Sequence, residues 1–132
     1  MGSCLACREV DGIVNKLNSF DDCVGWNELT RRFGAPPNLH DAELLRLTMW
    51  NENVTSRAEL LIHIPQQEGD VPIKLLMSIT GMVEMSLGGW HKLNVLWDCE
   101  FQMVGEIYRI DLIPTVGLEG WISSSEMSFV IA

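Results

Sequence analysis

Residues 36–43 read Pro36-Pro37-Asn38-Leu39-His40-Asp41-Ala42-Glu43, and the character of the sequence changes at this stretch. Two consecutive prolines cannot continue a helix and force an extended backbone. Before them, apolar residues recur at helical spacing, whereas after them apolar and polar residues alternate. We therefore expect a short helical part followed by a sheet.

The helical part predicts one or two helices. Apolar residues recur at helical spacing from Glu9 to Leu17. A second helix is expected to begin at a cap formed by Ser19 or by residues 21–22 and to run to about Phe33, where Gly34 marks its end. Residues 1–8 are expected to be disordered. The chain then forms a single domain over 1–132, with its core at about 9–132.

Alternation beyond the prolines predicts about seven strands. Glycine and other turn-forming residues separate them into 43–50, 59–64, 74–79, 82–87, 93–103, 106–113 and 121–132. The first two fit a hairpin, and Gly81 is expected to separate the third from the fourth. Parallel strands need long crossovers, for which there is no room. The predicted fold class is α+β, with an antiparallel, meander-like sheet.

Composition limits the classes of function. The chain has 132 residues, 47% of them hydrophobic, and carries 18 acidic against 9 basic residues, a net charge of −9. Nucleic acids and anionic membranes bind cationic surfaces, so neither is an expected partner. No apolar run reaches the roughly 20 residues of a membrane span, and the N-terminus lacks the pattern of a secretory signal. We expect a cytoplasmic protein whose acidity serves solubility or attracts a basic partner.

The first candidate for chemistry is His40 with Asp41 and Glu43. Histidine titrates near neutral pH and binds metals, and carboxylates can orient it. In an extended strand His40 and Asp41 would point to opposite faces, which argues against a compact catalytic site. The structural interpretation is a latch that ties the proline-bounded loop to backbone groups. A small metal-dependent or acid/base enzyme is the alternative, although no ligand spacing indicates a metal, and no cofactor is predicted.

The candidate binding residues are acidic or aromatic. An acidic loop at 65–72 and a later strand supply carboxylates that suit a basic partner, and a tryptophan after two glycines suits an interface. Trp97 is the weakest of the five tryptophans as an interface residue, because its strand looks like core. Exposed strand edges also leave open a homodimer or a homo-oligomeric scaffold. The partner-binding candidates are Glu68, Asp70, Trp90, Asp98 and Glu100.

The order of these features resembles the immunity protein 50 family of bacterial toxin-immunity systems. The similarity runs from Trp26 to Val130 and rests on Leu39-His40-Asp41-Ala42-Glu43, where the family has an aromatic residue in place of Leu39. It also includes residues 81–87, 93–96 and 114–117, so that Asn94 joins His40, Asp41 and Glu43 as a family-motif residue. The resemblance implies a protein without enzymatic activity that binds and neutralises a cognate toxin.

Overall fold

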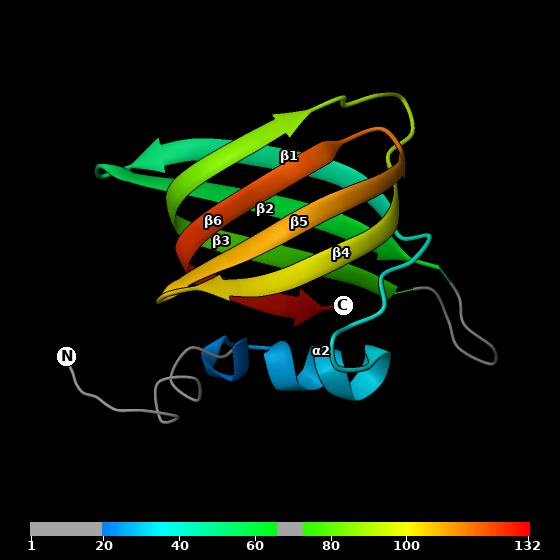
Figure 1. Cartoon of the computed structure of the whole chain (residues 1–132), viewed down its shortest axis with the longest axis horizontal. Coiled ribbons are helices and arrows are strands. Elements are labelled where there is room, and N and C mark those ends of the chain that lie inside the picture. Colours follow the sequence, from blue (N-terminus) through cyan, green and yellow to red (C-terminus); the bar gives the residue numbers. More distant parts are fainter. Residues whose placement is uncertain (1–19, 66–72) are drawn as a thin grey trace.

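The computed structural model describes residues 20–65 and 73–132, and in this part of the chain six antiparallel strands form a closed barrel (Figure 1). The strands are β1 (Glu43–Glu52), β2 (Thr55–Ile64), β3 (Ile73–Gly88), β4 (Val95–Val104), β5 (Ile107–Val116) and β6 (Glu119–Ile131). The predicted helix at 9–17 and the predicted disordered end at 1–8 lie outside the described residues. No helix within the described ranges is long and apolar enough to cross a membrane.

The antiparallel sheet after a short helical part is confirmed, but the count of about seven strands is wrong. The predicted strands at 74–79 and 82–87 form one continuous strand, β3, among the six of the described ranges. Gly81 has a φ of 69° and the pairing register shifts between Met82 and Glu84, so the strand bends where an interruption was expected. A glycine with positive φ fits such a bend because it lacks a Cβ.

The strand order departs from a simple meander. Around the barrel the order is β1-β2-β3-β6-β5-β4, so two three-stranded meanders, β1–β3 and β4–β6, are joined at two seams. β3 pairs with β6 along most of its length, whereas β1 pairs with β4 only at Glu43 and Val95. Long-range pairings of this kind leave no local pattern in a sequence.

The single predicted helix up to Phe33 is divided into a 3-10 turn, η1 (Phe20–Asp22), and a helix, α2 (Trp26–Phe33). Gly25 interrupts them with a φ of 87°, and the preceding Val24 accepts a hydrogen bond from Phe129 N–H of β6. A tertiary backbone contact therefore overrides the local helical preference. The helix ends as predicted, because Gly34 adopts a φ of 98° and donates its N–H to Thr30.

The barrel interior is apolar and the helical segment adds an aromatic cluster to it. Phe20 of η1 lies 4.8 Å from Trp26, measured between ring centroids, and Trp26 lies 5.0 Å from Phe101 and 5.5 Å from Phe129. Figure 1 shows η1 and α2 together on one side of the barrel. Fully buried side chains from the strands complete the core: Leu60, Ile62, Leu75, Met77, Ile79, Leu96, Ile110 and Ile122.

Candidate partner-binding surface

The proline-bounded stretch forms the seam between β1 and β4. Asp41 N–H donates to Leu96 O and Leu96 N–H donates to Ala42 O, both at 2.8 Å. Leu44 N–H donates to Asn94 O at the same distance. These three backbone bonds close the barrel on this side, so the stretch positions the start of β1 against β4.

The His40 side chain lies on this seam and is partly exposed. Its Nδ1 is 2.8 Å from the carbonyl oxygen of Trp97, and its ring meets the Trp97 ring edge-on at a centroid distance of 4.7 Å. Asn38 Oδ1 accepts a hydrogen bond from the His40 N–H. His40 is thus held by contacts to the loop and to β4, as a residue that ties backbone segments together would be.

Asp41 does not point away from His40 as an extended strand would require. Its φ is 68°, and its Oδ1 lies 3.5 Å from His40 Nε2. The expectation of opposite faces is wrong because β1 begins only at Glu43 and the residues before it form a turn. Glu43 itself pairs with His63 and Val95 in the sheet. Within the described ranges no group of three or more His, Cys, Asp or Glu residues could hold a metal ion.

Asn94 joins two turns at one end of the barrel. The side chain is 3% exposed, and its Oδ1 accepts the N–H groups of His91 (2.9 Å) and Leu118 (3.0 Å). Its Nδ2 donates to His91 O at 2.9 Å. The Asn94 side chain therefore makes three of the four hydrogen bonds open to an amide. The bond to Leu118 links the β3–β4 connection to the β5–β6 turn.

Carboxylates gather on the outward side of β4 and β5. Glu100 stands directly opposite Asp111 in the register of the two strands. Like charges in opposed positions destabilise a sheet. Arg109 forms two-pronged contacts with Asp111, its Nη2 lying 2.9 Å from Oδ1, and its guanidinium covers the Trp121 ring at 4.4 Å. Gln102 Nε2 also donates to Asp111 Oδ2 at 2.9 Å. Among the described residues, Glu100 has no ion pair, so its negative charge remains uncompensated.

These carboxylates affect the pKa of the buried Cys99 thiol. Burial raises the pKa of its thiol, and the negative charges of Asp98, Asp111 and Glu100 raise that pKa further. Asp98 also accepts the Cys99 N–H at 2.8 Å. Glu100 stands opposite Asp111 in the register, and Asp98 lies two positions before Glu100 on β4. We call Asp98, Glu100 and Asp111 the acidic surface. The high pKa keeps Cys99 protonated, which makes it a poor nucleophile.

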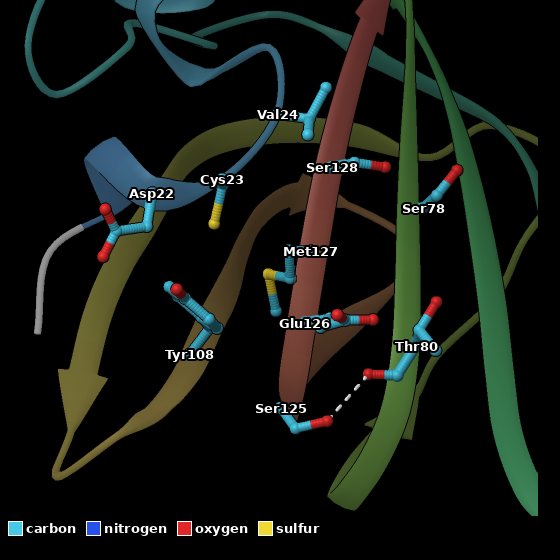
Figure 2. Close-up of a pocket in the computed structure, with 10 residues that line it drawn as sticks. All are labelled: Asp22, Cys23, Val24, Ser78, Thr80, Tyr108, Ser125, Glu126, Met127 and Ser128. Atoms are coloured by element: carbon cyan, nitrogen blue, oxygen red, sulfur yellow. Dashed lines mark hydrogen bonds between the residues drawn. The ribbon is translucent and has the colours of Figure 1, made fainter.

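A separate polar pocket of about 420 Å³ lies beside β6 (Figure 2). Asp22 and Glu126 supply carboxylates to it, and five side chains supply hydroxyl groups; none of the described residues that line it is basic. Figure 2 shows Asp22 and Tyr108 on one side of β6, with Thr80 on the other. Ser125 Oγ donates to Thr80 O, as the dashed line marks. The hydroxyl groups belong to Ser78, Thr80, Tyr108, Ser125 and Ser128.

The predicted partner-binding residues are only partly brought together. Asp98 and Glu100 are near one another on β4, whereas Trp90 is 49% exposed on the β3–β4 connection and Glu68 and Asp70 lie outside the described residues. The ranking of Trp97 as the weakest interface tryptophan rests on the premise that its strand is core, and that premise is wrong, because Trp97 is 59% exposed, more than Trp90.

A shift of register explains the exposure of Trp97. The pairing of β4 with β5 is irregular between Leu96 and Asp98, so that Leu96 is fully buried while Trp97 and Asp98 both reach the surface. Asp111 and Arg109 were not predicted as part of a site. The alternation of charged and apolar residues in β5 indicates a solvated face, but only the pairing with β4 places that face beside Glu100.

Comparison of the chain with family models, with curated proteins and with solved structures gave no match.

Proposed function

We propose that this protein is a non-catalytic, immunity-type protein that binds and neutralises a basic toxin protein in the cytoplasm through the acidic surface. The observation that carries the proposal is the opposition of Glu100 and Asp111 across β4 and β5. Two carboxylates in this position cost stability. Arg109 compensates Asp111, but Glu100 has no ion pair among the described residues, and a local rule broken in this way is typical of a functional surface. A cationic partner would supply the missing compensation.

The neighbourhood of the acidic surface suits a protein partner. Trp97 follows Leu96 on the same strand and is largely exposed, and tryptophan is enriched among residues that dominate binding energy. Carboxylates around an aromatic anchor accelerate encounter with a positively charged protein and fix its orientation. The resemblance to immunity proteins in the sequence supplies the class of partner, a toxin encoded beside this gene.

The test measures binding of the purified product of the adjacent gene. We expect association whose rate constant falls as salt is added, because exposed charges are screened beyond about 8 Å at physiological ionic strength. In the double variant Asp98→Asn/Glu100→Gln the association rate constant should drop by about tenfold at low salt. The amide oxygen that this variant carries at position 98 can still accept the Cys99 N–H, so the fold is retained.

The matched control is Glu106→Gln/Glu119→Gln, which removes the same charge from two other exposed positions. Its association rate constant should change by less than about twofold, because the attraction depends on where the charge lies. Equal effects of both double variants would contradict the assignment of the acidic surface. Absence of binding, together with absence of protection in cells that produce the adjacent gene's product, would contradict the proposed function.

A further inference from the structure

The strand β1 leaves one long edge unpaired. On one side it pairs with β2 from Glu43 to Glu52, but on the other side its pairing with β4 is confined to Glu43. Residues 46–52 therefore have no strand partner on that side within the described ranges. All of these residues except Leu47 are exposed at the surface, and Met49 and Trp50 are 36% and 38% exposed. An edge of this kind is a template for another strand.

The β1–β2 turn fixes which backbone groups face outward along this edge. Glu52 and Thr55 flank a two-residue turn, Asn53 and Val54, with positive φ values of 50° and 59°. Such a turn is closed by a pair that exchanges hydrogen bonds, and bonded and non-bonded pairs alternate from there. The register to Ala58 is regular, so Met49 belongs to a non-bonded pair. Its N–H and C=O point away from β2, toward the free edge, and those of residues 47 and 51 do likewise.

We propose that a second copy of the chain binds this edge, with the two β1 strands antiparallel and Met49 of each copy opposite Met49 of the other. In this register Arg46 of one copy faces Glu52 of the second copy, and the reverse pair forms by symmetry. The two-fold axis passes between the Met49 residues, whose outward N–H and C=O groups bond to each other. This one register therefore meets two requirements: the outward N–H and C=O groups of the two strands face each other, and opposite charges are paired.

The charge pattern argues for a second copy over an unrelated strand. Arg46 Nη2 lies 3.6 Å from Glu59 Oε1 within the chain, and Arg57 Nε lies 3.1 Å from Glu52 Oε1. Pairing of Arg46 with Glu52 of the second copy joins these two ion pairs into one row of alternating charge. Opposite charges in cross-strand positions stabilise a sheet, and they disfavour other registers. The strand is complementary to itself, as a two-fold interface requires.

Apolar side chains beside the edge would be covered in the same dimer. Leu45, Met49 and Trp50 are each more than a third exposed. In the proposed register Trp50 faces Thr48 of the second copy, and the two Met49 side chains meet at the axis. The acidic surface lies on β4 and β5, so the dimer is independent of the toxin-binding proposal and can be tested without any partner protein.

The first experiment measures mass by sedimentation at increasing protein concentration. The wild-type chain should move from monomer toward dimer, and Arg46→Glu or Glu52→Arg alone should raise the dimer dissociation constant by about tenfold, because each places like charges in both symmetric pairs. The combined Arg46→Glu/Glu52→Arg variant should restore the wild-type dissociation constant. A mixture of the two single variants should form heterodimers, since each supplies the charge that the other lacks.

The second experiment fixes the register by disulfide formation in a Cys4→Ser/Cys7→Ser background, where the other two cysteines, Cys23 and Cys99, are buried. Residues in a bonded antiparallel pair have Cα atoms about 5.5 Å apart, which suits a disulfide. Met49→Cys should therefore yield a covalent dimer on mild oxidation, whereas Thr48→Cys should not. Circular dichroism shows whether each variant is folded.

Three results would overturn the proposal: a monomer at all concentrations up to about 1 mM, a range that covers weak association; a dimer in which the double charge variant is as weak as the single ones; or equal cross-linking from Met49→Cys and Thr48→Cys in folded protein. Each is measured on the whole chain. None requires the adjacent gene's product, so failure here leaves the proposed function standing.

Discussion

Replacement of Asn94 by alanine should destabilise the barrel more than replacement of an exposed asparagine would. The substitution removes hydrogen bonds to His91 N–H, His91 O and Leu118 N–H. His91 is exposed, so water can replace its two bonds at a cost of about 0.5 kcal/mol each. Leu118 is 3% exposed, and its N–H would lose its acceptor at a cost of about 2 kcal/mol. The expected loss of unfolding free energy is therefore about 3 kcal/mol.

Urea denaturation followed by tryptophan fluorescence measures this loss. With a slope of about 1–3 kcal/mol per molar, the midpoint should fall by between about 1 and 3 M while the slope stays unchanged. Asn94→Asp keeps the acceptor for both N–H groups and loses only the donor to His91 O, so its loss should be smaller than that of the alanine variant.

Asn51→Ala is the matched control, because Asn51 is exposed and accepts a single hydrogen bond, from Ser56. Its loss should stay near about 0.5 kcal/mol, as is usual for surface substitutions. If Asn94→Ala costs less than about 1 kcal/mol, or no more than Asn51→Ala, water replaces the buried bonds and the reasoning from an unpaired Leu118 N–H is refuted.

Further perturbations test the turn, the helix start and the thiol. Val54 is fully exposed and has a φ of 59°, so Val54→Gly should relieve the strain of a left-handed backbone. The free energy of unfolding should rise by about 1 kcal/mol, which raises the thermal midpoint by about 4 °C, and an unchanged midpoint would contradict this. In Gly25→Ala, the added Cβ would lie 1.8 Å from Phe129 O, so calorimetry should show a loss of at least about 2 kcal/mol, and a smaller loss would mean that β6 can yield there. The pKa of Cys99 is raised above its ordinary value of 9.0, so above pH 9 the folded state keeps a proton that the unfolded state loses. The free energy of unfolding should therefore be unaffected by this thiol below pH 9 and should fall as the pH rises above 9. Urea midpoints measured across this range should fall less steeply in Cys99→Ala.

The elements that follow from local patterns were predictable, and those that depend on distant contacts were not. Alternation along β1 and β2 is visible in the sequence, and their antiparallel hairpin is confirmed. Gly81 indicates a special backbone conformation, but a glycine is equally typical of a bend within a strand and of a turn between two strands. Only the pairing of β3 with β6 on both sides of Gly81 decides between them.

The candidate site was predictable to a lesser extent. The carboxylates Asp98 and Glu100 follow from the composition of one strand, whereas their neighbour Asp111 depends on the register between β4 and β5. The exposure of Trp97 depends on an irregular pairing that no propensity encodes. His40 and Asp41 were placed on opposite faces because the left-handed conformation of a non-glycine residue is too uncommon to be expected.

The division of the barrel into two meanders has a consequence for the route by which the chain folds. Hairpins within β1–β3 and β4–β6 join residues that are close in sequence, so each can form in about 1–10 μs. The seam between β3 and β6 joins Leu75 to Ile131 and the other seam joins Glu43 to Val95. Closing such long loops costs entropy before any contact is gained, which slows folding. Closure of the seams therefore sets the folding rate. Because the hairpin turns form before the seams close, weakening a turn should mainly slow folding, whereas weakening a seam contact that forms late should mainly speed the opening of the native barrel.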